Sequence, residues 1–233
     1  MNLHRKTALV YLITSIALMV CVKICSAAVT TFAEQAPTQR ENCIVIDPGH
    51  GGEDGGAVSC SGIPESTYNL EISCKLNDLL NLMGYQTLLI RDSDISVYKA
   101  GETLAQKKAS DLKERVRIVN ETNGAVLVSI HQNYFGDSRY SGAQVFYAQT
   151  EGSEQLAKEL QAEFLSTLNP GSRRQAKQSK GIYVMERIQR PGILVECGFL
   201  SNPQEERKLR EAPYQKMLSA VIASTLSRYL SNT

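Results

Sequence analysis

The feature that most constrains this chain is a regular alternation of short β-branched runs and longer segments with helical spacing, which begins near residue 42. The helix expected over residues 65–84 ends at Gly84, and the residues with core spacing in it are Leu76, Leu79, Leu80 and Met83. Strands that alternate with helices in this way predict an α/β domain with a mostly parallel, twisted sheet. The hydrophobic content of 42% over 233 residues suits one such domain.

The pattern predicts about six strands, flanked by helices. The expected strands are residues 43–47, 85–91, 125–130, 142–148, 181–185 and 192–196, and the expected helices are residues 65–84, 109–124, 153–168 and 213–230. The sequence contains no internal repeat, so a single domain is expected.

The N-terminal residues 1–28 have the pattern of a secretory leader. Arg5 and Lys6 precede an apolar run over residues 8–22, and Ala27 provides a small residue near a cleavage point. A membrane-spanning helix needs about 20 apolar residues, which is more than this run offers. A cleaved signal peptide is therefore favoured over an uncleaved membrane anchor.

The polar, aperiodic residues 29–41 are expected to form a linker to a folded domain at residues 42–233. Removal of the leader would change the formal charge from +1 to −2, because the leader holds three Lys and Arg residues and no acid. No nucleic-acid partner is expected at this charge. The basic pairs at 107–108 and 173–174 are interpreted as solvated surface, with contact to an anionic glycan as the alternative.

Three apolar strands lead into polar residues that can do chemistry. The first leads to His50, the third to His131 and the last to Glu196. Ligands bind outside the carboxyl ends of strands in such sheets, so these residues are expected to share one edge. The two histidines are the only ones outside the leader, and glycines at 49, 51, 52, 55 and 56 allow the backbone a close approach.

Two imidazoles and one carboxylate form the ligand set of a catalytic zinc ion. Glu65 opens the first helix and can fold back towards His50, but an acid at a helix N-terminus is equally common as a partner of the helix dipole. The residues alone leave both interpretations open. The carboxylate candidates are Asp47, Glu53, Asp54, Glu65, Glu71 and Glu196.

Glu196 lies between apolar residues, where an unpaired charge is costly. One interpretation is a buried ion pair with an arginine such as Arg91 or Arg190. The other is a general base that takes a proton from an attacking water molecule.

Four cysteines lie outside the leader, at scattered spacings and without a C-x-x-C pair. This pattern argues against a thiolate zinc site. We expect these residues to be small buried hydrophobic side chains. They are Cys43, Cys60, Cys74 and Cys197.

Several short motifs together resemble a known family. They include VIDPGHGGEDGGA, GIPESTYNLEIS, LKERVRIVN, VSIHQN, SGAQVFY and LVECGFLSN, and they extend from Asn42 to the C-terminal helix. In order and spacing they resemble the zinc-dependent N-acetylmuramoyl-L-alanine amidases of the Amidase_3 class. The strongest similarity is to the germination-specific amidases of spore-forming bacteria.

The resemblance implies a role for four residues. His50, Glu65 and His131 match the three Zn²⁺ ligands of the family, and Glu196 matches its catalytic glutamate. It also implies that residues 42–233 form a catalytic amidase domain, which hydrolyses the amide between N-acetylmuramic acid and L-alanine in peptidoglycan.

Two further residues are weighed beside the resemblance. Asp47 is predicted to orient His50 through its second ring nitrogen, with a turn-capping acid as the alternative. Cys197 stands where the family usually has a hydrophobic residue such as methionine. A cysteine-dependent wall hydrolase that uses Cys197 and a non-catalytic peptidoglycan-binding module remain as alternative functions.

The resemblance also implies where the protein works. We expect export across the cytoplasmic membrane to the cell envelope, in the cortex region of the forming spore, as a step towards the muramic-δ-lactam needed for germination. Besides peptidoglycan, an accessory protein that activates or recruits the enzyme is expected as a partner. Membrane contact is expected only through an uncleaved leader.

Overall fold

The computed structural model describes Met19, Lys23 and residues 42–232. The predicted cleavage point and the predicted linker lie outside these residues. Within the described part of the chain, no helix has the length and apolar character needed to cross a membrane.

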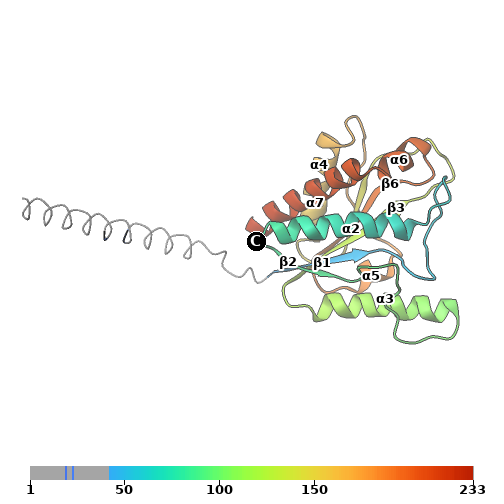
Figure 1. The fold of residues 1–233 in the computed structure, drawn as a ribbon, viewed down its shortest axis with the longest axis horizontal. Coiled ribbons are helices and arrows are strands. Elements are labelled where there is room, and N and C mark those ends of the chain that lie inside the picture. Colours follow the sequence, from blue (N-terminus) through green and yellow to red (C-terminus); the bar gives the residue numbers. More distant parts are fainter. Residues whose placement is uncertain (1–18, 20–22, 24–41, 233) are drawn as a thin grey trace, which may run out of the picture. The chain divides into compact units, whose positions relative to one another are not determined.

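A six-stranded sheet forms the centre of the domain, with strand order β2-β1-β3-β6-β4-β5 (Figure 1). The β1, β2, β3 and β6 strands are parallel, β4 is antiparallel to β6, and β5 is parallel to β4. This confirms the predicted mostly parallel α/β sheet. The strands are β1 (Cys43–Pro48), β2 (Gln86–Leu89), β3 (Ala125–Asn133), β4 (Gln144–Tyr147), β5 (Lys177–Gln178) and β6 (Gly192–Phe199).

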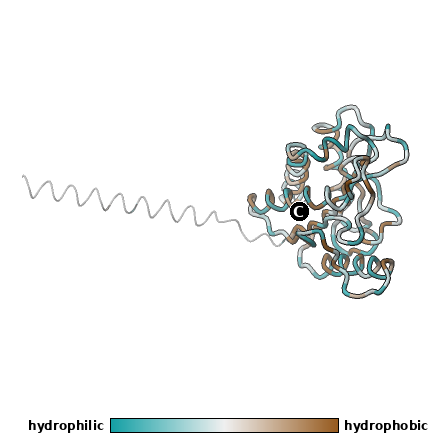
Figure 2. The backbone as a smooth tube through the Cα atoms, turned by 45° about the vertical axis from the view of Figure 1, so that its right-hand side comes forward, coloured by the Kyte–Doolittle hydropathy of each residue, from teal (hydrophilic) through white to brown (hydrophobic). Residues whose placement is uncertain are grey.

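Helices cover both faces of the sheet, and hydrophobic stretches of the chain run between the two helical layers (Figure 2). One face packs against α2, α4 and α7, and the other against α3 and α5. The helices are α2 (Glu65–Leu82), α3 (Leu104–Glu121), α4 (Ser153–Thr167), α5 (Tyr183–Arg187), α6 (Pro203–Leu209) and α7 (Ala212–Asn232).

The strand predicted at residues 181–185 is wrong, because this run leads into helix α5. Val184 and Met185 are buried, and they pack against the sheet face that α3 also covers. The strand that pairs with the outer side of β4 is instead Lys177–Gln178. A short apolar run has the same pattern whether it joins a sheet or covers one, so periodicity alone does not separate the two.

Helix ends are set by local caps that the apolar pattern does not contain. Helix α3 begins at Leu104 rather than Ala109, because Thr103 and Gln106 form a capping box. The short helix α6 was not expected. It follows Asn202, whose side chain accepts hydrogen bonds from the backbone of Gln204 and Glu205.

The register of the sheet determines where polar side chains meet. His131 of β3 lies opposite Glu196 of β6, near the carboxyl ends of both strands. Since side chains alternate between faces, Leu127, Leu194 and these two residues share the face covered by α3 and α5. This arrangement places both residues at one edge of the sheet, as the sequence predicts.

Candidate metal centre

Glu65, the first residue of α2, lies between the two histidines. Its Oε1 is 3.0 Å from Nδ1 of His131 and its Oε2 is 3.3 Å from Nε2 of His50. The carboxylate is also held by the backbone N–H groups of Ala57 and Gln132, at 3.1 Å each. Burial alone would raise the pKa of Glu65, but the hydrogen bonds with both histidines hold this pKa well below its usual range.

The arrangement fits a zinc ion. One donor atom from each of His50, Glu65 and His131 can be chosen so that all three lie within 4.8 Å of one another. An ionised carboxylate and two imidazoles also form a set that zinc accepts. The structure thus brings together the three residues that the family resemblance assigns to the metal.

Glycine residues make this close packing possible. A Cβ atom on Gly49 would lie 2.2 Å from Cε1 of His131, and one on Gly56 would lie 2.7 Å from Oε2 of Glu65. The loop between them also holds His50 at a φ of 60°, a left-handed conformation that is uncommon outside glycine. The glycine loop therefore gives both imidazoles room at the edge of the sheet.

We expect Gly49→Ala to weaken zinc binding by roughly 10–100-fold, the range seen when the supports of metal ligands are lost. The new methyl group would displace the ring of His131. Zinc affinity, measured by competition with a chelating dye, checks this result. Gly136→Ala is the control, because a Cβ atom there meets nothing within 4 Å. Equal affinity in the two variants would contradict the expectation.

The second ring nitrogen of His50 has a different partner from the one predicted. Its Nδ1 lies 3.0 Å from Oδ2 of Asp54, whereas Asp47 forms a buried ion pair with Arg115 and accepts a hydrogen bond from Ser129 at 2.7 Å. The predicted contact of Asp47 with His50 is therefore wrong. The left-handed turn at His50 points the ring towards Asp54. Burial lowers the pKa of His50, but the contacts with Glu65 and Asp54 outweigh burial and raise it.

Two buried arginines hold the backbone that leads to His50. Arg115 donates to the carbonyl oxygens of Pro48 and His50, at 2.9 and 2.7 Å. Arg91 donates to those of Pro48 and Gly49, at 2.9 Å each. The sequence did not suggest these contacts, because the arginines lie at least 40 residues from the loop and carbonyl acceptors leave no residue pattern.

Glu196 has no paired arginine among the residues that the structure describes. Its Oε2 is buried and has no hydrogen-bond partner there. Arg91 binds carbonyl oxygens, and Arg190 donates to the carbonyl oxygen of Asn120. The ion-pair interpretation of Glu196 therefore fails in the described structure. Burial raises the pKa of Glu196 to about 7.

The other predicted carboxylate candidates lie apart from the three clustered ligands. Glu53 is exposed and pairs with Lys107 at 2.8 Å, and Glu71 accepts a hydrogen bond from Gln215 at 2.7 Å. Neither belongs to the group of donor atoms that can share one ion.

Cys197 follows Glu196 but faces the opposite side of the sheet. Its side chain is buried in the core that packs against α2, α4 and α7, and burial raises the pKa of its thiol far above the ordinary range. A thiol on that side, held protonated, does not suit a nucleophile. The other three cysteines are also free thiols. Cys60 is exposed and Cys43 and Cys74 are only half-buried, so the expectation of four buried cysteines is correct for Cys197 alone.

We expect Cys197→Ala to keep most of the activity of the enzyme and to lose about 1 kcal/mol of stability from the smaller side chain. Activity per folded molecule and the free energy of unfolding in urea check the two parts. A cysteine hydrolase would lose its reaction completely in this variant.

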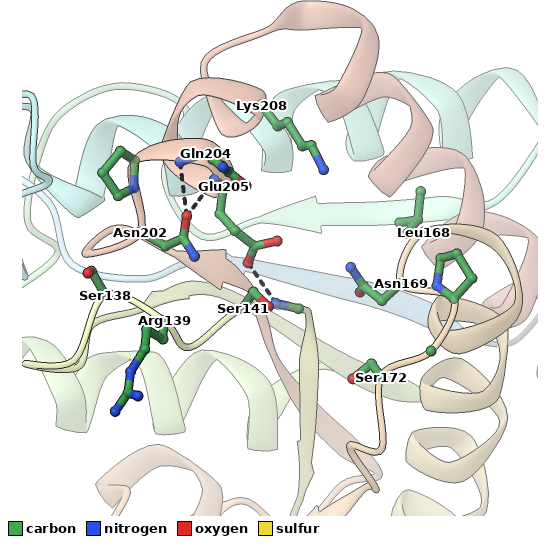
Figure 3. A pocket seen from close by; sticks show the side chains of 14 residues that line it. Ser138, Arg139, Ser141, Leu168, Asn169, Ser172, Asn202, Gln204, Glu205 and Lys208 are labelled. Atoms are coloured by element: carbon green, nitrogen blue, oxygen red, sulfur yellow. Dashed lines mark hydrogen bonds between the residues drawn. The ribbon is translucent and has the colours of Figure 1, made fainter.

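The site opens into a cavity of about 270 Å³ on the face covered by α3 and α5, and His50, His131 and Tyr183 help to line it. A larger hollow of about 860 Å³ lies elsewhere, between Ser138, Asn169 and α6 (Figure 3). None of the three clustered ligands lines the larger hollow. The chemistry is therefore expected in the smaller cavity.

The mostly parallel sheet brings together two histidines, the Glu65 carboxylate between them, and the unpaired carboxylate of Glu196. These groups are the donor set of a metal-dependent hydrolase. Residues 44–228 match the Amidase_3 family, described as N-acetylmuramoyl-L-alanine amidase. The chain belongs to this family.

Relatives agree with this assignment over most of the chain. The germination-specific N-acetylmuramoyl-L-alanine amidase of Bacillus subtilis (strain 168) is 36% identical over 190 residues, which are 81% of this chain and 79% of the relative. N-acetylmuramoyl-L-alanine amidase LytC of the same organism is 31% identical over 190 residues, covering 80% of this chain and 35% of LytC.

Solved structures show the same fold. The CwlD amidase from Clostridioides difficile, solved in complex with the GerS lipoprotein, has a TM-score of 0.79 and 36% identity, and the match covers 82% of this chain and all of that chain. An N-acetylmuramoyl-L-alanine amidase from Clostridium difficile 630 has a TM-score of 0.72 and 31% identity, over 83% of this chain and 99% of that chain.

Proposed function

We propose that this protein is a zinc-dependent amidase of peptidoglycan, with the zinc held by His50, Glu65 and His131. Membership of the N-acetylmuramoyl-L-alanine amidase family supports the reaction. The observation that carries the metal assignment is the position of the Glu65 carboxylate between two imidazoles, with three donor atoms within 4.8 Å of one another.

A zinc ion held by His50, Glu65 and His131 would supply Lewis-acid chemistry, because it would lower the pKa of a water molecule towards about 7 and polarise the carbonyl of the scissile amide. Glu196 accepts the proton of the attacking water at its carboxylate and returns it to the nitrogen of the leaving alanine. Its position opposite His131 supports this role. Asp54 holds Nδ1 of His50 and so fixes the orientation of this ring. The products are the muramic acid carboxylate and a peptide that begins with L-alanine.

The test is mass spectrometry of muropeptides after incubation with the zinc-loaded protein. We expect free peptide with an N-terminal alanine, loss of the reaction with EDTA, and recovery with added zinc. Products cut at any other bond, or a reaction that EDTA leaves unchanged, would contradict the proposal.

We expect His131→Ala to lower bound zinc several-fold, because the ion then keeps only two of its three protein ligands. Elemental analysis of the purified variant measures this loss directly. Gln149→Ala serves as a control outside the cluster. Full zinc content in the His131 variant would refute the ligand assignment.

We also propose a role in the spore cortex, supported by the germination-specific relative. In this proposal residues 1–28 direct export to the cell envelope, residues 29–41 act as a linker, and residues 42–233 carry out the reaction. The neighbouring CwlD amidase was solved with a lipoprotein, which supports an accessory partner for this chain. Higher specific activity in spore extract than for the purified enzyme would support the partner, and equal activity would count against it.

A further inference from the structure

A positively charged groove lies beside Glu196, on the side away from the three metal ligands. It is a cavity of about 480 Å³, and its lining includes Arg139, Arg173, Arg174 and Lys177. No carboxylate of the described residues lines it. The cavity at the metal centre differs, because Asp47, Asp54 and Asp111 line it together with Lys108 and Arg115. The groove is therefore suited to an anionic part of a ligand.

The sheet connects this groove to the reaction site. Gln144 of β4 lies directly opposite Glu196 of β6 in an antiparallel pair, so their side chains share a face of the sheet. Oε1 of Gln144 accepts a hydrogen bond from Nη1 of Arg174 at 2.8 Å. His131 of β3, Glu196 of β6 and Gln144 of β4 therefore lie side by side on neighbouring strands, and Arg174 extends this row into the groove.

Arg174 is the best-positioned cation in this groove. Its guanidinium lies 4.6 Å from the centre of the Phe199 ring, and its Nε donates to the carbonyl oxygen of Ser141 at 2.8 Å. The contacts to Ser141 and Gln144 use two of the five N–H donors of the guanidinium. An arginine fixed in this way loses little entropy when it binds a planar anion.

The carboxylates near this groove already have other hydrogen-bond or ion-pair partners. Burial lowers the pKa of Arg174 and the nearby charge of Glu205 opposes this shift, but the Glu205 carboxylate accepts hydrogen bonds from the backbone N–H groups of Gly142 and Phe199, at 2.7 and 3.3 Å. Arg139 of the same groove is paired with Asp137 at 2.6 Å. Among residues 42–232, Arg174 has no carboxylate within ion-pair distance.

We propose that Arg174 is a specificity-determining residue that binds a carboxylate of the acidic peptide joined to muramic acid. The inference rests on the proposed function, because that reaction brings a peptide to Glu196. The sugar that carries the amide is uncharged, whereas the peptide has free carboxylates. The nearest of these belongs to the D-glutamate that follows L-alanine. Arg174 therefore holds the peptide side of the substrate, and the interpretation of this arginine as merely solvated surface is replaced.

The test compares two substrates in which the γ-carboxyl of glutamate is blocked as an amide: N-acetylmuramoyl-L-alanyl-D-glutamate γ-methylamide, whose α-carboxylate is free, and the same compound with this α-carboxylate converted to a carboxamide. A hydrogen-bonded charge pair favours the carboxylate substrate at least about tenfold in kcat/KM for the wild-type protein. Arg174→Ala is expected to remove this preference, mainly through KM. Arg174→Lys is expected to keep part of it, because the charge remains without the planar fork.

Arg228→Ala is the matched control. It removes the same charge from α7, where Arg228 pairs with Glu163 at 2.7 Å, and it is expected to keep the wild-type preference. Melting temperatures verify that all variants are folded, and Arg174→Gln replaces the alanine variant if that variant does not fold. A wild-type protein that cleaves both substrates equally, or an Arg174→Ala variant that keeps the preference, would overturn the assignment.

A binding measurement separates this inference from the reaction itself. Calorimetric titration of the zinc-loaded protein with the product peptide L-alanyl-D-glutamate, which is not cleaved further, is expected to show at least about tenfold weaker binding for Arg174→Ala than for wild type. If the wild-type protein cleaves neither substrate, the proposed amidase function fails, and the titration still decides the role of Arg174. Equal binding by the two proteins would refute that role.

Discussion

Glu196→Gln is expected to lower the rate of amide hydrolysis by roughly 10²–10⁴-fold, the contribution typical of a positioned general base. Glutamine keeps the size of the side chain but cannot take a proton from the attacking water. Zinc content should not change, because Glu196 is outside the group of three donors that can share an ion. A loss of rate at full zinc occupancy would show that Glu196 acts in catalysis and does not bind the metal.

Rates of muropeptide cleavage and elemental analysis on the same samples provide the two measurements. Gln178→Ala, at the edge strand, is a control for nonspecific losses on purification. The experiment also addresses the alternative of a peptidoglycan-binding module without activity, since such a module has no reaction to lose. A variant that hydrolyses the amide at the wild-type rate would remove Glu196 from the mechanism.

Arg115→Met is expected to destabilise the folded domain by about 3–5 kcal/mol, the cost of removing one partner from a buried ion pair. Arg115 and Asp47 have side chains that are each only 2% exposed. The change leaves the Asp47 charge buried and also removes the hydrogen bond to the carbonyl oxygen of His50, whereas the carbonyl oxygen of Pro48 keeps its bond from Arg91. Because Asp47 lies within the buried strand β1, little water reaches it to compensate.

Urea denaturation followed by circular dichroism measures this loss. Arg117→Met is the matched control on the same helix, where a side chain 50% exposed pairs with Glu114 and Glu121 and should contribute no more than about 1 kcal/mol. Similar losses in both variants would contradict the prediction. The double variant with Asp47→Asn should recover part of the stability, since the unpaired charge is then removed.

The difference in stability between wild type and Arg115→Met depends on pH, and its direction follows from the pKa of Asp47. Burial would raise the pKa of Asp47, but the charge of Arg115 and the hydrogen bond from Ser129 outweigh it and hold the pKa below its ordinary value of about 3.9. The stability that the pair contributes is therefore present above that value and is lost as the pH falls further. The gap between wild type and Arg115→Met should narrow under acid conditions.

Parts of the site could be predicted from the sequence because the end of an apolar run marks the end of a strand. An apolar run that stops at a histidine or glutamate predicts a polar group at the carboxyl edge of the sheet, which located His50, His131 and Glu196. Glu65 needed the family resemblance, since an acid in the first turn of a helix has an ordinary explanation as well. The structure adds the contacts of Glu65 with both rings.

Other parts depend on three-dimensional contacts that leave no local pattern. The choice of Asp54 rather than Asp47 beside His50 follows from one left-handed residue. The carbonyl contacts of Arg91 and Arg115 join segments that are far apart in the chain. The same limit explains the misplaced strand at residues 181–185, because burial against a sheet and pairing within it require the same apolar residues.

Three separate segments supply the proposed ligands: the turn after β1, the first residue of α2, and β3. An ion that binds only when all three are in place adds its binding free energy to that of folding, about 2.7 kcal/mol at a hundredfold excess over the dissociation constant. Folding and zinc uptake are then thermodynamically linked. A chelator would consequently lower the free energy of unfolding of the protein as well as stop its reaction.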